Sequence, residues 1–262
     1  MSEAVIGPLP GPGLAIGAGF IFGLIFGSFL GALVLRWPEG RSVLSGRSHC
    51  DGCGRTLGAG ELIPLLSALM SRGRCRTCGA RIDPLHGRME LGCGLIGAIA
   101  MALVPLPWAL GWMALGWILL ALAVLDARHF WLPDGLTVSL AFLGLTIGPW
   151  MTGVRWEDAL IGAAAGYGIL LVVAVGYKKA RGREGLGLGD AKLLGALGAW
   201  FGWQALPFIL LGASSLALVW TAVRTLGGAQ IDGGTKIALG TFLCIAAVPA
   251  GIAARMLLFS GG

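Results

Sequence analysis

The chain has 262 residues, of which 56% are hydrophobic and only 12% are charged, and its formal net charge is +6. A soluble globular protein carries roughly 25% charged residues, so this chain lacks much of the polar surface that a fold of its size needs in water. The composition excludes an ordinary soluble enzyme, a disordered chain and a nucleic-acid-binding module, and it predicts an integral membrane protein.

Eight apolar segments follow one another along the chain, and a helix that crosses the hydrocarbon core needs about 20 residues. The fold class is therefore predicted to be an all-α polytopic membrane protein with about eight transmembrane helices. In the first segment, glycines recur every four residues and form a smooth stripe that favours close packing against another helix. The predicted segments are 14–35, 89–105, 108–125, 135–151, 159–177, 188–203, 205–223 and 237–259, and the glycines of the stripe are Gly19, Gly23, Gly27 and Gly31.

The basic residues are distributed unevenly between the connecting segments. With eight alternating helices, one side of the membrane holds 17 of the 19 Lys and Arg residues, and only Arg155 and Arg255 fall elsewhere. This asymmetry is typical of the cytoplasmic side, and its segments are 36–88, 126–134, 178–192 and 224–236. The N-terminus, with Glu3 and no basic residue, is predicted to face outward and to contain no cleaved targeting peptide.

The longest connection, residues 36–88, is polar and rich in Gly and Arg. We divide the chain into a first helix with its short N-terminus (1–35), this cytosolic loop (36–88) and a multi-helix membrane core (89–262). The loop holds two Cys-x-x-Cys-Gly units, formed by Cys50, Cys53, Cys75 and Cys78. Four thiolates at this spacing predict a closed, tetrahedral, structural zinc site. Disulfides are disfavoured in the cytosol, and a redox site would need one such unit rather than two.

Two acidic residues are predicted to lie at the cytoplasmic ends of their helices, at similar depth. Asp126 ends an apolar run, and Asp190 precedes another one in the sequence Gly187-Leu188-Gly189-Asp190. Ionisable groups at a membrane boundary are candidates for function. The alternative is helix capping, which we expect for Asp134 at the start of the fourth segment and which remains open for Asp190.

The chain resembles the type IV prepilin peptidases, membrane aspartic proteases with a Gly-x-Gly-Asp motif. Three separated segments carry the resemblance, in the order and at about the spacing of that family. They are Gly27-Ser28-Phe29-Leu30 with the two-cysteine-pair loop, Asp126 through Leu132-Pro133-Asp134, and Gly187 through Trp200. Any one of them alone is weak, whereas the combination is specific.

The resemblance implies that Asp126 and Asp190 are the catalytic pair and that the four loop cysteines bind zinc. It also implies that the protein lies in the bacterial inner membrane and removes the basic leader of prepilins or pseudopilins at the cytoplasmic face, as in type IV pilus assembly and protein secretion. Gly187 and Gly189 have no side chains to obstruct an extended substrate backbone near Asp190. Which pilin is cut, and which aspartate carries a proton, stay open.

Many members of that family also methylate the new N-terminal amine with S-adenosylmethionine, which would place a methyltransferase region in 36–88. This chain departs from the methylating relatives in that region. Gly31 stands where they usually have Asn, and Gly60-Glu61-Leu62 stands where Asp-Asn is common, although Glu90 is retained. Methyl transfer therefore stays open at this point.

Two other classes of function fit part of the pattern. An ion-coupled transporter uses membrane acids as proton or cation sites, and a membrane scaffold would use the zinc loop only to bind partners. A transporter predicts acids nearer the middle of the membrane and internally repeated helices, neither of which the sequence has. Cleavage of a prepilin distinguishes the peptidase from both.

Overall fold

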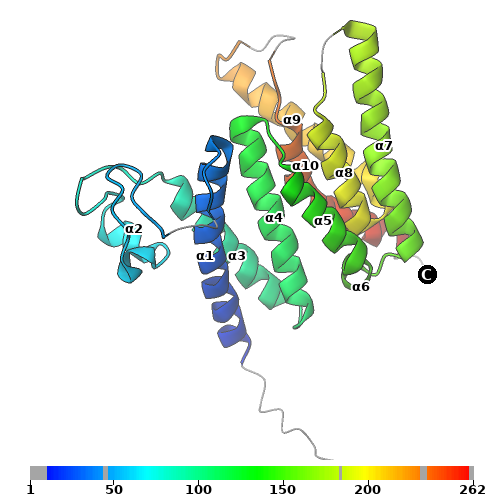
Figure 1. Cartoon of the computed structure of the whole chain (residues 1–262). Coiled ribbons are helices and arrows are strands. Elements are labelled where there is room, and N and C mark those ends of the chain that lie inside the picture. The colour runs from blue at the N-terminus through cyan, green and yellow to red at the C-terminus, as the bar shows by residue number, and fades with distance from the viewer. Residues whose placement is uncertain (1–10, 44–46, 183–184, 231–234, 260–262) are drawn as a thin grey trace, which may run out of the picture. The chain divides into compact units, whose positions relative to one another are not determined.

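The computed structural model describes residues 11–43, 47–182, 185–230 and 235–259, and this part of the chain is helical, without strands (Figure 1). Glu3 lies outside the described residues. Eight helices coincide with the eight predicted apolar segments. They are α1 (Pro12–Arg36), α3 (Leu85–Leu103), α4 (Trp108–His129), α5 (Asp134–Thr146), α7 (Trp156–Arg181), α8 (Leu188–Phe201), α9 (Leu206–Leu226) and α10 (Leu239–Phe259).

Five of these helical segments are long and apolar enough to cross a membrane, namely Pro12–Glu39, Trp108–His129, Trp156–Arg181, Trp203–Leu226 and Leu239–Leu258. The protein is thus an all-helical membrane protein. The predicted segment 135–151 is divided between α5 and the short helix α6 (Gly148–Thr152). Pro149 explains the division, because proline has no amide hydrogen to continue the hydrogen bonding of α5.

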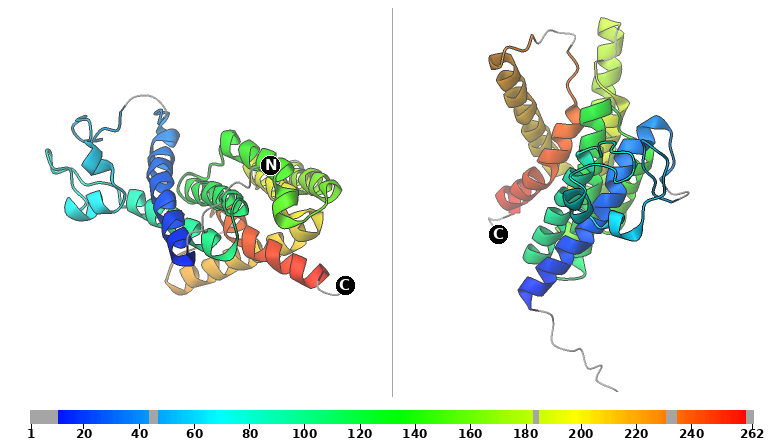
Figure 2. Two further views of the ribbon diagram at one scale, coloured as in Figure 1. Left: turned by 90° about the horizontal axis from the view of Figure 1, so that it is seen from below. Right: turned by 90° about the vertical axis from the view of Figure 1, so that its left-hand side faces the viewer.

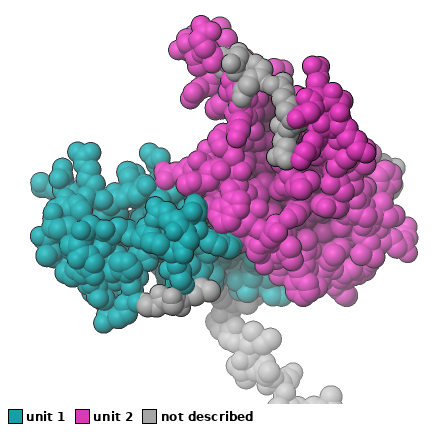
Figure 3. Space-filling model, turned by 45° about the horizontal axis from the view of Figure 1, so that its top comes forward, with its two compact units in different colours: residues 1–120 teal, residues 121–262 magenta. Residues whose placement is uncertain are grey.

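The chain forms two compact units, residues 1–120 and 121–262 (Figure 3). In the first unit, α1 and α3 pack at very short range through the predicted glycine stripe. A Cβ atom added to Gly19 would lie 2.6 Å from the carbonyl oxygen of Gly97, and one on Gly27 would lie 2.6 Å from that of Met89. The prediction of a helix-packing surface is therefore confirmed. Three short helices complete this unit: η1 (Trp37–Glu39), η2 (Ala59–Leu62) and α2 (Leu66–Met70).

The second unit is built around α8. Eleven of its 14 residues are buried, and α7 runs beside it in the views of Figures 1 and 2. Gly166 permits this approach, because a Cβ atom there would lie 2.6 Å from the carbonyl oxygen of Leu194. The indole of Trp200 donates a hydrogen bond to the carbonyl oxygen of Leu140 on α5 at 2.8 Å. A short helix, η3 (Trp203–Ala205), then leads into α9.

Candidate active site and metal centre

Asp126 lies in the last turn of α4 and is only 5% exposed. Its Oδ2 atom accepts two hydrogen bonds from one residue of α10. The backbone N–H of Thr241 donates at 2.6 Å, and the Thr241 hydroxyl donates at 3.0 Å. The carboxylate is therefore held against the first turn of α10.

Asp190 lies in the first turn of α8 and is 9% exposed. Its carboxylate interacts with the backbone N–H groups of Gly187 and Gly240 and electrostatically with Asp126. Gly187 is the N-cap residue of α8, and Asp190 is the third residue of the helix. An acidic side chain at the third position commonly accepts a hydrogen bond from the backbone N–H of the N-cap residue. The side chain thus supports the helix start. Its Oδ1 atom is buried and has no hydrogen-bond partner among the described residues.

The two aspartates, far apart in sequence, both lie beside the start of α10. Gly240 lies next to both side chains. A Cβ atom added to Gly240 would lie 3.0 Å from Asp126 Oδ2, and the backbone N–H of Gly240 interacts with the Asp190 carboxylate. Leu132, in the turn after α4, fills the adjacent space. The same added Cβ atom would lie 2.8 Å from Leu132 Cδ1.

The glycines of the Gly-x-Gly-Asp motif are also closely packed. A Cβ atom on Gly187 would lie 3.3 Å from Asp190 Oδ2, and one on Gly189 would lie 3.0 Å from Leu132 Cβ. Both glycines therefore have a local packing role beside the aspartates.

Sequence reasoning missed the contribution of α10. Gly240 and Thr241 fall inside an apolar segment that had been predicted only as a membrane helix. Asp134 was also wrongly expected to be a helix cap: the N-cap of α5 is Pro133, and Asp134 is the first residue of the helix. Its carboxylate instead accepts a hydrogen bond from Lys192 of α8.

The four loop cysteines form a cluster within the first unit. Their sulfur atoms all lie within 4.8 Å of one another, and Cys50 Sγ lies 3.8 Å from Cys78 Sγ. Zinc–sulfur bonds of about 2.3 Å in a tetrahedron place the sulfur atoms about 3.8 Å apart. The cluster thus fits zinc in ligand type, number and spacing. Cys93 and Cys244 are buried in α3 and α10 instead.

Each cysteine pair is shaped by the same turn. In the first, the Cys50 N–H donates to the carbonyl oxygen of Arg55, and the N–H of Gly54 donates to that of Cys50. In the second, Cys75, Ala80 and Gly79 make the equivalent bonds. Gly54 and Gly79 have φ values of +70° and +71°, which glycine adopts without steric cost. This explains the glycine that follows each pair. Backbone N–H groups of Cys78 and Thr77 lower the pKa of Cys75 to about 6, whereas burial and the neighbouring cysteines raise the pKa of Cys78 to about 11.

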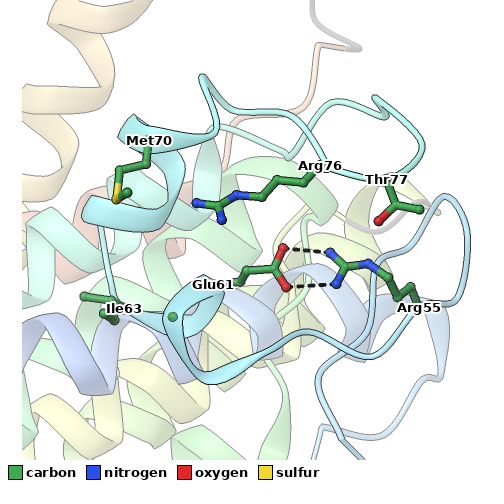
Figure 4. A pocket seen from close by; sticks show the side chains of 7 residues that line it. Arg55, Glu61, Ile63, Met70, Arg76 and Thr77 are labelled. Atoms are coloured by element: carbon green, nitrogen blue, oxygen red, sulfur yellow. Dashed lines mark hydrogen bonds and ion pairs between the residues drawn. The ribbon is translucent and has the colours of Figure 1, made fainter.

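A pocket of about 480 Å³ lies beside the cysteine pairs (Figure 4). Its main polar feature is a bidentate ion pair, in which Arg55 donates to the two carboxylate oxygens of Glu61 at 2.7 and 3.0 Å. The hydrogen bonds from Arg55 and from the backbone N–H of Gly58 lower the pKa of Glu61 to about 2. The pocket is lined by Arg55, Gly60, Glu61, Ile63, Met70, Arg76 and Thr77.

Glu90 connects the loop to α3. It is only 7% exposed, and its Oε2 atom accepts a hydrogen bond of 2.8 Å from the backbone N–H of Leu65. Leu65 has a φ value of +59°, which is unfavourable for a residue with a branched side chain. The buried acceptor thus stabilises a strained turn at the start of α2.

Comparison with known proteins identifies the family of the chain. The model of the type IV leader peptidase family matches residues 113–222, and that of the bacterial peptidase A24 N-terminal domain matches residues 21–104. No solved structure matches the chain.

Several relatives carry the name prepilin leader peptidase/N-methyltransferase. The protein from Stutzerimonas stutzeri is 36% identical over 250 residues, which cover 86% of both chains. The one from Klebsiella pneumoniae is 42% identical over 208 residues, covering 76% of this chain and 90% of the relative. The one from Aeromonas hydrophila is 40% identical over 220 residues, covering 74% and 76%. With these identities and coverages, the chain belongs to the type IV leader peptidase family.

Proposed function

We propose that this protein is an aspartic endopeptidase that removes the leader peptide of type IV prepilins or pseudopilins at the cytoplasmic face of the bacterial inner membrane. The observation that carries the proposal is that two buried carboxylates, those of Asp126 and Asp190, both lie beside the start of α10. The names of the relatives supply the substrate class.

Hydrolysis by such a pair follows from elementary chemistry. Two carboxylates held close together in a poorly hydrated site cannot both ionise at low cost, so the pair holds one proton. The ionised carboxylate takes a proton from a water molecule, whose oxygen attacks the carbonyl carbon of the scissile bond. The protonated carboxylate gives its proton to the carbonyl oxygen. When the tetrahedral intermediate collapses, the C–N bond breaks and a proton passes to the leaving nitrogen. In this scheme the absence of side chains at Gly187 and Gly189 serves twice: it allows the close packing beside Leu132 and Asp190, and it lets the extended substrate backbone approach Asp190.

The membrane topology that fits this function has eight crossings. The helices found at all eight apolar segments support it, and so do the 17 Lys and Arg residues that it brings to one face. This arrangement puts the ends of α4 and α8 that carry the aspartates on the cytoplasmic side. A prepilin has a polar leader followed by an apolar helix. Its cleavage site, between the two, therefore lies at the cytoplasmic membrane boundary, at the depth proposed for the aspartates.

We propose a structural role for zinc in the loop 36–88. Cys50, Cys53, Cys75 and Cys78 would supply four thiolates and leave no coordination position for substrate. Bound zinc would join the two cysteine turns, and no step of the hydrolysis needs it.

Methylation of the new N-terminus is a second proposed activity, supported by the name of the relatives. The pocket beside the cysteine pairs has a volume within the range of small-molecule sites. Arg76 offers a guanidinium for the carboxylate of S-adenosylmethionine, which would supply the methyl group. Glu61 is already paired with Arg55 on both oxygens, so it attracts the sulfonium charge less than an unpaired acid would.

The test is cleavage of a purified prepilin by the protein in proteoliposomes. Asp126→Asn and Asp190→Asn should each lower the rate by about 100-fold or more, the usual contribution of a general acid or base. Asp158→Asn is the matched control, because the Asp158 carboxylate accepts a hydrogen bond from the Trp203 indole at 2.9 Å, outside the proposed catalytic pair. Near wild-type cleavage by either site variant refutes the catalytic pair.

An intact prepilin with the wild-type protein would favour a transporter or a scaffold. Mass spectrometry of the cut pilin, with S-adenosylmethionine present, reads out methylation in the same experiment.

A further inference from the structure

The two aspartates have different hydrogen-bonding environments. Oδ2 of Asp126 accepts both the backbone N–H and the hydroxyl of Thr241, at 2.6 and 3.0 Å. The carboxylate of Asp190 also interacts with two N–H groups, those of Gly187 and Gly240, but its Oδ1 atom is buried and has no partner among the described residues. This asymmetry bears on which aspartate carries the proton.

The Thr241 hydroxyl has a choice of two acceptors. Its Oγ1 atom lies 3.0 Å from Asp126 Oδ2 and 3.1 Å from the carbonyl oxygen of Ala123 on α4. A hydroxyl has a single hydrogen, and a charged acceptor forms the stronger bond. The hydroxyl therefore donates to Asp126 when that carboxylate is ionised.

Two donors on one oxygen have a chemical consequence. Hydrogen bonds to the charged form of a carboxylate stabilise that form, and here both are directed at Oδ2. They also fix the carboxylate plane and leave Oδ1 of Asp126 as the atom that receives a new proton. A buried carboxylate oxygen without a partner is costly as an anion, so Asp190 is the better place for the proton that the pair shares.

We propose that Thr241 is a positioning residue that makes Asp126 the general base and leaves Asp190 as the general acid. The inference rests on the proposed peptidase function and assigns the roles within it. Water gives its proton to Asp126 Oδ1 as its oxygen bonds to the scissile carbonyl carbon, and Asp190 gives its proton to the carbonyl oxygen. Both protons come from groups already in the scheme, so no further reactant is needed.

The experiment compares Thr241→Val, which removes the hydroxyl at nearly constant volume, with Thr241→Ser, which keeps it. A hydrogen bond to a charged group contributes enough that its loss should lower kcat roughly 10- to 100-fold. KM should stay within about twofold, because Thr241 does not touch the substrate in this scheme. Thr241→Ser should keep kcat within about threefold of the wild type. Thr241→Ala, a second variant without the hydroxyl, should behave like Thr241→Val, and thermal unfolding in detergent identifies any misfolded variant.

The matched control is Thr221→Val on α9, where the hydroxyl donates to the helical carbonyl oxygen of Ala217 at 2.8 Å. It should cut at the wild-type rate. Wild-type kcat in Thr241→Val overturns the inference, and so does a Thr241→Ser variant as slow as Thr241→Val. An equal loss in Thr221→Val also overturns it, because the effect would then come from the membrane helices in general. If the wild-type protein fails to cut a prepilin, the proposed function fails instead, so the two failures are distinguishable.

Discussion

Lys192 donates a hydrogen bond to Asp134 Oδ1 at 2.6 Å and joins the second turn of α8 to the first turn of α5. Lys192 is two residues after Asp190, and Asp134 is two residues after Leu132, which packs on Gly189. The ion pair thus connects the two segments that meet beside the catalytic candidates. Both side chains are more than a third exposed, so the pair contributes little to global stability.

We expect this ion pair to affect catalysis more than folding. Lys192→Met and Asp134→Asn should each lower the cleavage rate about two- to fivefold and change the free energy of unfolding by less than about 1 kcal/mol. The double variant should be no slower than the slower single variant, because the same interaction is lost. Lys179→Met, near the end of α7, is the charge-loss control. Additive losses in the double variant would show that the two residues act independently.

Gly240 should be essential for the geometry of the site. In Gly240→Ala, the new methyl group would meet Leu132 Cδ1 at 2.8 Å and Asp126 Oδ2 at 3.0 Å. The Leu132 side chain can move, whereas Thr241 holds the Asp126 carboxylate with two hydrogen bonds. We expect the methyl group to displace this carboxylate and cleavage to fall about tenfold or more. Leu132→Ala should restore part of the rate in the double variant. Gly176→Ala on α7, where an added Cβ atom meets nothing within 4 Å, should leave cleavage unchanged.

Zinc should bind the loop with a stoichiometry of about one ion per chain, as expected for four thiolate ligands. Elemental analysis of the purified protein measures this directly. Replacing any of Cys50, Cys53, Cys75 or Cys78 with Ser should remove most of the metal, whereas Cys93→Ala, outside the cluster, should retain it. Equal metal content in all five variants would place the ion elsewhere.

Much of this fold follows from local patterns. Helices occur at all eight apolar segments, because a helix satisfies its backbone hydrogen bonds internally where water is absent, although only five segments are long and apolar enough to cross a membrane. The four-residue glycine repeat of α1 correctly predicted a helix-packing surface, because residues at this spacing lie on one face of a helix whatever the partner is. The identity of that partner, α3, depends on the three-dimensional packing. The cysteine spacing likewise predicted a cluster, because each turn is local.

The surroundings of the aspartates were less accessible. Asp126 and Asp190 stand out as acids at the ends of apolar runs, but Thr241 is a common residue at a helix start. Its role arises from a contact with Asp126, 115 positions away in the sequence, and no local sequence pattern predicts such a contact. Asp134 was misjudged for the same reason, because an acid at a helix start suggests capping whereas Lys192 of another helix is its partner.

The shortness of α8 has a consequence for the access of water. At a rise of 1.5 Å per residue, its 14 residues extend about 21 Å, whereas the hydrocarbon core is about 30 Å thick. Most of the helix is enclosed by protein, since 11 of these residues are buried, but Gly187 and Leu188, just before Asp190, are exposed. Solvent can therefore reach the Asp190 end of the helix, and a reaction that consumes water can proceed there beside an apolar substrate.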